Sequence, residues 1–325
     1  MIFIYNKSLN PFYNMAAEEY LVKNSQDEIF MLWQNDNTIV IGRNQNTLSE
    51  INYDYVKENN INVVRRMSGG GAVFHDMGNI NFTFILNSGN DFSNYKKFTQ
   101  PIIDFLKTLG ADASLSGRND LVIGDKKISG NAQYMYKNRI LHHGTLLYNS
   151  EENKLASSLR VSEDKIQSKG IKSVRSRVTN IHDHITVPLT AKEFIEKLKM
   201  FMLSKGNIRG EYDLERDNKE IQKLCDEKYA TWDWNFGYSP KYSFSKKQRF
   251  QSGCVEVCMD VKTNGIIEDI KIFGDFFSKL DVKDLENIIC GHKHEYGELK
   301  NLLDTVCVSD YISGITETDF LNIIF

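Results

Sequence analysis

The chain has few cysteines, few prolines and no long hydrophobic run. Only five of its 325 residues are cysteine, all at or after Cys225, and only four are proline. The N-terminal segment MIFIYNKSLNPF lacks the basic and apolar regions of an export signal, so the odd number of cysteines predicts free thiols in a reducing compartment. No apolar stretch is long enough to span a bilayer. We therefore expect a cytoplasmic protein without a membrane segment.

The net charge is small overall but unevenly distributed. It is −3, with 41% hydrophobic and 26% charged residues, which is typical of globular proteins and indicates no nucleic-acid surface. Residues 251–325 contain six lysines and no arginine against fourteen acidic residues, a net charge of −8, which leaves +5 for residues 1–250. The larger, cationic part suits anionic small-molecule substrates.

The most informative stretch runs from Arg65 to Phe82, RRMSGGGAVFHDMGNINF. Two arginines and three consecutive glycines lie between two predicted strands, at 61–64 and 79–86. Such glycines are costly to order, and their exposed N–H groups can surround a phosphate or carboxylate, with Arg66 adding a fork of donors. A flexible hairpin tip is the simpler interpretation, but no Asn-Gly or Asp-Gly turn is present. The Walker A and G-x-G-x-x-G patterns are also absent, so we predict an anion-binding loop of another kind.

The pattern of apolar residues predicts helices and strands in two units. Strands are predicted at 28–33, at 38–41 and, as antiparallel neighbours, within 113–147, and amphipathic helices at 102–109 and 192–203. The basic segment 169–180 has no apolar face and is predicted to be a mobile loop.

An aromatic cluster at 232–238 precedes Pro240, and a new alternating strand pattern begins near Val255. We therefore predict a catalytic unit at 1–245 and a small α+β accessory unit at 246–325.

Two lysines and an aspartate outside the glycine stretch are candidates for chemistry. Lys126 and Lys127 lie on a predicted strand, so at most one of them points toward the glycine loop. A lysine beside bound phosphates stabilises the charge of phosphoryl or nucleotidyl transfer, whereas the alternative is a solvated edge residue. Asp120 lies one short hairpin away and is a candidate Mg²⁺ ligand, although a lone carboxylate is a weak indication.

The histidines and cysteines give weak indications of a metal site. His75, His142 and His143 lack the spacing of a helical H-x-x-x-H ligand pair, so we expect hydrogen-bonded structural residues first. A zinc site in the C-terminal part is disfavoured because C-x-x-C spacing is missing. Its candidate ligands are Cys254, Cys258, Cys290, His292 and His294.

Several motifs resemble, in order and over nearly the full length, those of the lipoate-protein ligases. The central motif is RRMSGGGAVFHD, from Arg65 to Asp76. The other motifs are Asn119-Asp120 with Lys127-Ile128-Ser129-Gly130, His143-Gly144-Thr145-Leu146, SVRSRVTN from Ser173 to Asn180, NMAAEE from Asn14 to Glu19, and GDFF from Gly274 to Phe277. The resemblance implies an α+β fold: a mixed, mainly antiparallel β-sheet with flanking helices, shared with biotin-protein ligases, and a small α+β C-terminal domain.

The resemblance also implies an ATP-dependent ligase that acts in two steps. The carboxylate of lipoate would attack the α-phosphate of ATP and release pyrophosphate. A lysine ε-amine on a lipoyl domain would then take the lipoyl group from lipoyl-AMP. The implied partners are lipoyl domains of 2-oxoacid dehydrogenase E2 subunits or the glycine-cleavage H protein, with lipoate or octanoate as acyl substrate, Mg²⁺ as metal, and neither nucleic acid nor membrane.

The same resemblance assigns roles to residues of this chain. Lys127 would be the catalytic residue, touching the lipoyl carboxyl end and the α-phosphate, and Asp120 the likeliest protein ligand of Mg²⁺. The nucleotide would contact Arg66, Gly71, Ala72, Val73, Phe74 and Lys127. The lipoyl group would contact Arg66, Ser68, Gly69, Gly70, Gly71, His75, Lys127 and His143. A loop that closes over the adenylate and excludes water would contain Ser173, Val174, Arg175, Arg177 and Val178.

Three other functions stay open. An ATP-independent octanoyl- or lipoyl-transferase of the same fold would pass the acyl group through a cysteine thioester. The position of the cysteines disfavours it, because the first of them, Cys225, follows every motif except GDFF. A biotin ligase is disfavoured because its biotin loop has another pattern and no helix-turn-helix precedes the first strand. A non-enzymatic carrier of lipoate or lipoyl domains would bind its substrate without releasing pyrophosphate.

Overall fold

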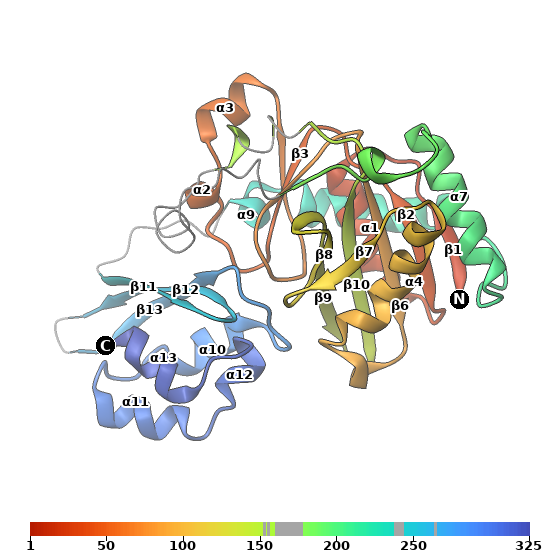
Figure 1. The fold of residues 1–325 in the computed structure, drawn as a ribbon. Helices are drawn as coiled ribbons and strands as arrows, with labels where there is room; N and C mark the ends of the chain where they lie inside the picture. The colour runs from red at the N-terminus through yellow and green to blue at the C-terminus, as the bar shows by residue number, and fades with distance from the viewer. Residues whose placement is uncertain (152–153, 155–156, 160–177, 237–243, 263–264) are drawn as a thin grey trace.

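The protein consists of a larger and a smaller lobe (Figure 1). The computed structural model describes residues 1–325 except 152–153, 155–156, 160–177, 237–243 and 263–264. The larger lobe contains two sheets and their surrounding helices, and the smaller lobe contains the chain from β11 to the C-terminus.

A seven-stranded sheet, in the order β1-β2-β6-β10-β9-β8-β7, forms the frame of the larger lobe. Only β1 and β2 are parallel, and every other neighbouring pair is antiparallel. Short turns join the strands from β7 to β10 in series, which accounts for the antiparallel pairing of these four. The predicted mainly antiparallel sheet is therefore confirmed. Its strands are β1 (Ile2–Tyr5), β2 (Ile29–Trp33), β6 (Asn79–Leu86), β7 (Ala113–Ser116), β8 (Asp120–Ile123), β9 (Lys126–Tyr136) and β10 (Arg139–Leu147).

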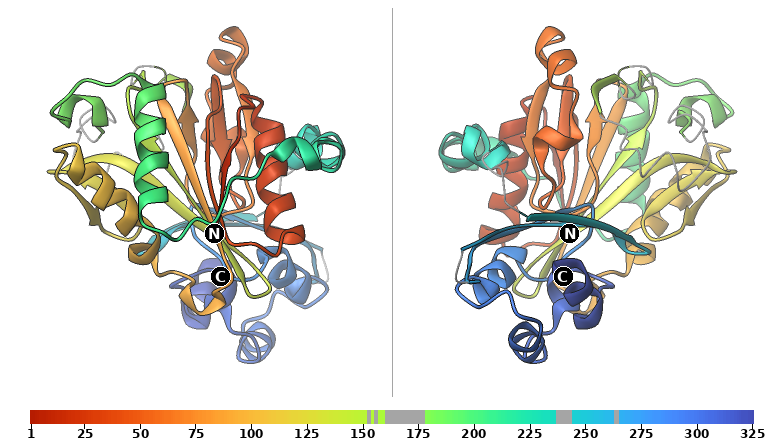
Figure 2. Two further views of the ribbon diagram at one scale, coloured as in Figure 1. Left: turned by 90° about the vertical axis from the view of Figure 1, so that its right-hand side faces the viewer. Right: turned by 90° about the vertical axis from the view of Figure 1, so that its left-hand side faces the viewer.

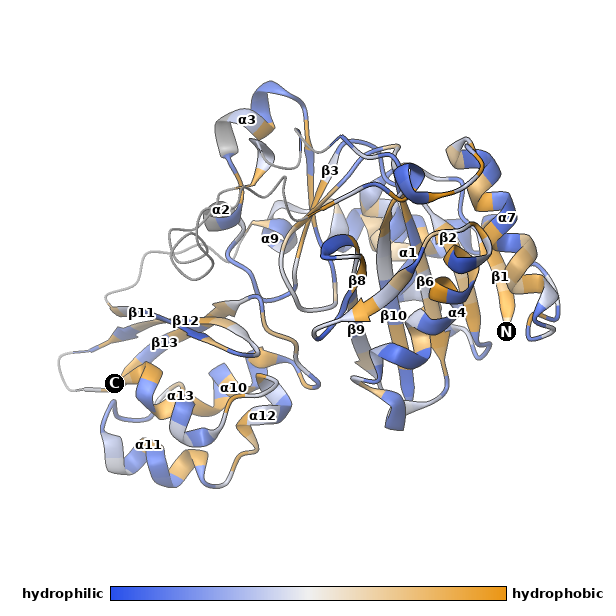
Figure 3. Cartoon of the chain, viewed as in Figure 1, coloured by the Kyte–Doolittle hydropathy of each residue, from blue (hydrophilic) through white to orange (hydrophobic). Residues whose placement is uncertain are grey.

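Helices cover both faces of this sheet. All of β2 is buried, because Phe30 and Leu32 face one hydrophobic core while Met31 and Trp33 face the other. The first core is closed by α4 and α7 and the second by α1 and α8, and Figure 2 shows α1 and α7 on opposite sides of the strands. Figure 3 shows the hydrophobic residues of β1 and β2 between these layers. The helices are α1 (Pro11–Asn24), α4 (Tyr95–Thr108), α7 (Ala191–Ser204) and α8 (Asn218–Leu224).

Local capping explains where two of these helices begin. The Asn10 side chain accepts hydrogen bonds from the backbone N–H groups of Phe12 and Tyr13 at the start of α1, and Pro11 occupies the first helical position. Thr190 and Glu193 form a reciprocal capping box at the start of α7. These caps determine the residues at which α1 and α7 begin.

A three-stranded sheet, in the order β4-β3-β5, carries the glycine-rich stretch. β3 is parallel to β4 and antiparallel to β5, and residues 66–72 connect β4 to β5. The short strand β5 lies inside the central motif, where the sequence predicted only loop. The elements of this region are β3 (Thr38–Ile41), α2 (Thr47–Glu50), α3 (Tyr53–Glu58), β4 (Asn62–Arg65) and β5 (Val73–His75).

The smaller lobe has its own sheet and its own core. Residues of β12 and β13 pack against all four helices that follow. Phe244 and Ser245 pair with Met259 and Cys258, so the predicted boundary at residue 245 would cut β11; the division into two units stays a prediction. The elements are β11 (Phe244–Phe250), β12 (Gly253–Val261), β13 (Ile267–Gly274), α10 (Val282–Ile289), α11 (Tyr296–Leu303), α12 (Val308–Tyr311) and α13 (Glu317–Ile324).

Short helical turns connect the remaining parts of the larger lobe. They are η1 (Gly89–Asp91), η3 (Ile181–His184), η4 (Leu214–Asp217), the π-helix η5 (Cys225–Tyr229) and α9 (Trp232–Asn235). Within the part of the chain that the structure describes, no helix is long and apolar enough to cross a membrane.

Candidate active site

The two arginines at the end of β4 serve different parts of the protein. Arg65 is 1% exposed and joins two segments that are distant in sequence. Its guanidinium donates hydrogen bonds of 2.6–3.2 Å to the carbonyl oxygens of Gly42, Arg43, Gln45, Trp234 and Asn235 and to the Thr47 hydroxyl. Arg65 therefore stabilises the frame around the glycine loop rather than a ligand.

Arg66 holds the glycine loop in shape. Its Nε donates to Ser68 Oγ at 3.0 Å, and its Nη2 donates to the carbonyls of Gly69 at 2.6 Å and Gly71 at 2.9 Å. Burial lowers the pKa of Arg66 to about 10, which leaves the side chain cationic at neutral pH. Gly70 has a φ of +91°, a conformation that favours glycine. The loop is thus a rigid turn with a buried positive charge behind it.

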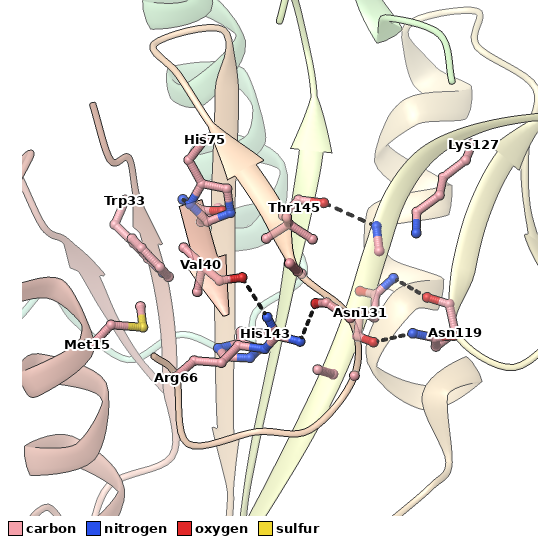
Figure 4. Close-up of a pocket in the computed structure, with 18 residues that line it drawn as sticks. Met15, Trp33, Val40, Arg66, His75, Asn119, Lys127, Asn131, His143 and Thr145 are labelled. Carbon is pink, nitrogen blue, oxygen red and sulfur yellow. Dashed lines mark hydrogen bonds between the residues drawn. The ribbon is translucent and has the colours of Figure 1, made fainter. Parts of the chain in front are cut away.

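A pocket lies between the glycine loop and strands β9 and β10 (Figure 4). Its empty volume is about 610 Å³, counting space open to solvent. Figure 4 shows Lys127 on one side of the pocket, with Trp33 and Met15 on the opposite side. The lining residues are Met15, Trp33, Val40, Arg66, Gly70, Gly71, Ala72, Val73, His75, Asn81, Asn119, Lys127, Gly130, Asn131, Ala132, His143, Gly144 and Thr145.

Lys127 provides the cation on the open side of the pocket. Its Nζ lies 2.8 Å from Asp120 Oδ1, and both side chains are a little more than one-third exposed. Its carbonyl accepts a 3.0 Å hydrogen bond from the N–H of Thr179, and Val178 bridges it in parallel, so residues 178 and 179 lie beside the pocket. Lys126 is exposed and does not line the pocket, as strand alternation requires.

Small residues leave room around Lys127. A Cβ at Gly130 would lie 2.9 Å from Lys127 Nζ, and a Cβ at Gly144 would overlap the Phe82 ring. Asn119 and Asn131 fix the neighbouring wall, since each side-chain amide donates to the backbone carbonyl of the other, at 2.6 and 2.9 Å.

A series of buried polar side chains connects helix α1 to the glycine loop. His143 Nδ1 lies 2.9 Å from Glu18 Oε2, and His143 Nε2 lies 2.6 Å from Ser68 Oγ. Glu18 also accepts a 2.6 Å hydrogen bond from the Thr83 hydroxyl. A carboxylate beside Nδ1 favours a proton there, so that Nε2 accepts from Ser68. Ser68 in turn accepts from Arg66, which links helix α1 to the loop.

The predicted site residues divide into four groups. Asp120 and Val178 contact Lys127. Arg66, Gly70, Gly71, Ala72, Val73, His75, Lys127 and His143 line one pocket. Three others lie beside it: Ser68 bonds His143, Gly69 contacts Phe276, and Phe74 packs in the core behind β3. Ser173, Val174, Arg175 and Arg177 lie outside the described residues.

Sequence reasoning missed several residues that shape the pocket. Asn119, Gly130, Gly144 and Thr145 stand within the quoted motifs, but the motifs alone indicate no role for them. Met15, Trp33, Val40 and Asn81 gave no indication beyond membership of a predicted helix or strand. Glu18 is missed because its partner His143 lies 125 residues away and only packing brings them together.

The smaller lobe touches the glycine loop directly. The N–H of Gly70 donates to the Phe276 carbonyl at 3.1 Å, and the N–H of Gly274 donates to the Asn44 carbonyl at 2.7 Å. The Phe277 ring lies between Tyr95, with ring centroids 5.8 Å apart, and the Arg118 guanidinium, 4.3 Å from the ring centroid. The GDFF motif therefore contacts the glycine loop, which forms one wall of the pocket.

Two family models cover most of the chain. Residues 10–202 match the lipoyl protein ligase A/B catalytic domain. Residues 239–324 match the bacterial lipoate protein ligase C-terminus. The chain belongs to the lipoate-protein ligase family. The family recognised from the sequence motifs is confirmed.

Curated relatives of this ligase family align over the whole chain. The lipoate-protein ligase LplJ of Bacillus subtilis (strain 168) is 45% identical over an alignment of 332 residues that covers 100% of both chains. Lipoate–protein ligase 1 of Staphylococcus aureus (strain Mu50 / ATCC 700699) is 43% identical and covers 99% of both. These names confirm the predicted enzyme class, and neither of them favours the ATP-independent transferase.

Solved structures of ligases share the fold. P. falciparum LipL1 in complex with lipoate has a TM-score of 0.80 at 28% identity and covers 99% of this chain and 97% of that one. A lipoate-protein ligase A bound with ATP has a TM-score of 0.63 at 26% identity and covers 73% of this chain and 98% of that one. The α+β fold predicted from the resemblance is confirmed.

Proposed function

We propose that this chain is an ATP-dependent lipoate-protein ligase that works in two steps. A carboxylate oxygen of lipoate forms a bond to the α-phosphorus of ATP, and pyrophosphate leaves. A lysine ε-amine of an acceptor protein then attacks the lipoyl carbonyl, loses a proton and displaces AMP. The acceptors are lipoyl domains of 2-oxoacid dehydrogenase E2 subunits or the glycine-cleavage H protein, and octanoate is a second acyl substrate. A bipartite lipoate protein ligase of Thermoplasma acidophilum, studied with its E2 lipoyl domain, supports this class of partner.

One observation carries the proposal: Lys127 and the glycine loop line the same pocket. Lipoate carboxylate and ATP repel each other, so their reaction requires positioning and neutralised charge. Lys127 supplies a compact positive charge where the carboxylate and the α-phosphate would meet. The less polar side, with Met15, Trp33 and Val40, suits the hydrocarbon chain and ring of a lipoyl group.

The glycine loop would contribute backbone rather than side chains. The Arg66 guanidinium donates to carbonyls of the loop and so orients the remaining backbone groups of Gly71, Ala72 and Val73 toward the nucleotide. A buried cation in the pocket wall also favours the polyanionic substrate. The segment that ends at Val178 would close over the adenylate and exclude water, as the family resemblance implies.

The described residues around Lys127 are poorly suited to binding Mg²⁺ by themselves. Among the described residues no three His, Cys, Asp or Glu side chains gather in a metal-binding group. Asp120, the predicted ligand, is already 2.8 Å from Lys127. Mg²⁺ bound mainly by substrate phosphates is the arrangement that this donor set allows.

The cysteines disfavour the ATP-independent transferase. All five lie in described parts of the chain, and none of them lines the pocket. Burial raises the pKa of the Cys225 thiol to about 11, opposite to what a thioester-forming nucleophile needs. We also propose that the catalytic unit covers about the first three-quarters of the chain, that the smaller lobe is an accessory unit, and that the enzyme works in the cytoplasm.

The deciding experiment is lipoate-dependent ATP–pyrophosphate exchange. We expect exchange in the wild type, a loss of at least a hundredfold in Lys127→Ala, and little change in Lys126→Ala, whose lysine is one residue away and exposed. Intact-mass measurement of a lipoyl domain would follow the second step. Absence of exchange in the wild-type protein would contradict the proposal, and equal losses in both variants would remove Lys127 from its assigned role.

A further inference from the structure

His75 lies in the wall of the pocket with one nitrogen bonded and one nitrogen free of protein partners. The side chain is buried, and its ring contacts the Trp33 ring edge-on with centroids 6.2 Å apart. Nδ1 lies 3.1 Å from Asn35 Nδ2 and 3.5 Å from Asn81 Nδ2. Nε2 is buried and has no hydrogen-bond partner among the described residues. Such a group is uncommon in folded proteins and calls for an explanation.

A network of asparagines decides which nitrogen of His75 carries the proton. Asn14 Nδ2 lies 2.9 Å from the carbonyl oxygens of both Ser8 and Gln34, so this atom must be the donating nitrogen. The same nitrogen lies 2.8 Å from Asn35 Oδ1, which must therefore be the accepting oxygen. The NH₂ group of Asn35 consequently faces His75, and His75 Nδ1 must accept.

The hydrogen bonds of a second asparagine pair agree with the same tautomer. Asn79 Nδ2 donates to Asn81 Oδ1 at 2.9 Å, which turns the NH₂ group of Asn81 toward His75. Burial, with smaller effects of Arg66 and His143, lowers the pKa of His75 to about 3, so the ring is neutral near neutral pH. Two donors at Nδ1 leave the single proton on Nε2. The pocket wall therefore holds a buried N–H group that needs an acceptor.

We propose that the Nε2–H of His75 is a specificity-determining donor for a sulfur atom of the lipoyl dithiolane ring, held in that tautomer by Asn35. The inference rests on the proposed function, since it concerns the acyl substrate of the same site. With the carboxylate at Lys127, the far end of the acyl chain reaches the side lined by Trp33 and Met15, where His75 lies (Figure 4).

Sulfur is a weak acceptor, but the carbon tail of octanoate offers no acceptor at all. An all-carbon tail would leave this buried N–H group unpaired, whereas a sulfur atom would pair it, which favours lipoate. The donor therefore acts by stabilising the sulfur-containing tail, and the expected preference for lipoate from this contact is about three- to tenfold in Kd.

The test measures binding without ATP, so that it does not depend on catalysis. Calorimetry would compare lipoate with the analogue in which a cyclopentane ring replaces the dithiolane, because the two differ in sulfur rather than in shape. The variants are His75→Gln, whose amide reaches the position of Nε2 and keeps a donor there, and His75→Asn, whose amide reaches only the position of Nδ1. We expect the wild type and His75→Gln to prefer lipoate by about three- to tenfold, and His75→Asn to bind both ligands alike.

Wild-type protein alone gives a second readout if a variant does not fold. Histidine ¹⁵N spectra near pH 8 should show His75 with a protonated Nε2 and an unprotonated Nδ1, and the Nε2 resonance should shift with lipoate but not with the cyclopentane analogue. Asn35→Asp places an acceptor beside Nδ1, so the proton should move there and the preference should disappear.

The outcomes separate this inference from the proposed function. Equal wild-type affinity for lipoate and the analogue, an unaltered preference in His75→Asn, or a proton on Nδ1 would each overturn the inference, even if pyrophosphate exchange is observed. Lipoate binding with a clear preference but no exchange would support the donor and contradict the ligase. Absence of lipoate binding would overturn both.

Discussion

The backbone N–H of Gly70 donates to the carbonyl oxygen of Phe276 at 3.1 Å, so the glycine loop and the GDFF segment share a hydrogen bond across the two lobes. Arg43 and Asp281 add an ion pair of 2.8 Å between the same lobes. The position of the smaller lobe and the shape of the glycine loop are therefore coupled.

Gly69→Ala should disturb this coupling. The added methyl group would overlap the carbonyl oxygen of Phe276, which is backbone and cannot rotate away. We expect the smaller lobe to shift and lipoate-dependent pyrophosphate exchange to fall by at least tenfold, about 1.4 kcal/mol. Gly210→Ala is the matched control, because a methyl group there meets nothing within 4 Å. Unaltered exchange in Gly69→Ala would show that the contact is not required for adenylation.

Arg65→Lys should destabilise the protein more than it alters the chemistry. A lysine retains the charge but cannot reach the six acceptors that the planar guanidinium serves. We expect a loss of about 3 kcal/mol in the free energy of unfolding, measured with urea. Arg216→Lys, in an exposed turn, should change it by less than about 0.5 kcal/mol. A stable Arg65→Lys protein would argue that buried water replaces the lost contacts.

The stability of the protein should fall as the pH is lowered from about 6.5 to about 4. Burial lowers the pKa of His75 to about 3 and that of His142 well below its usual value, so only the unfolded state binds these protons in that range. Each histidine should contribute up to about 1.4 kcal/mol per pH unit. His75→Gln should therefore show a shallower dependence in urea titrations at several pH values, and a dependence as steep as that of the wild type would contradict the contribution of His75.

Replacing the exposed cysteines should leave exchange intact. Cys290 and Cys307 are exposed in the smaller lobe, and neither lines the pocket. The double variant Cys290→Ser, Cys307→Ser should retain wild-type exchange and wild-type transfer to a lipoyl domain. Alkylation of the exposed thiols of the wild type under native conditions should also leave exchange and transfer unchanged. A loss of transfer with intact exchange would revive a thioester route for the second step.

Some elements of this fold can be predicted from the sequence alone, and others cannot. The strand at β2 and the helix at α7 follow from local periodicity and capping, which act within a few residues. The three-residue strand β5 does not follow from the sequence, because its pairing with β3 is non-local and its own residues include a histidine. Tertiary contact, not propensity, decides such short strands.

The candidate site shows the same division. The resemblance of the motifs to those of the ligase family is sufficient to assign Lys127, Arg66 and His75 to one site. It could not distinguish the roles of the adjacent Arg65 and Arg66, because those depend on which way each guanidinium turns at the end of β4. Nor could it pair Glu18 with His143, since the contact spans 125 positions and arises only when α1 packs on the sheet.

The acceptors of Arg65 lie far apart in the sequence, which decides when its contacts can form during synthesis. The catalytic family match ends at residue 202, yet two of the carbonyls that satisfy this buried cation belong to Trp234 and Asn235. During synthesis Arg65 can complete these contacts only after about 170 further residues have been made. A fragment cut at the end of the family match would lack these two acceptors and leave that side of the guanidinium to water, so we expect it to fold less stably than the full chain.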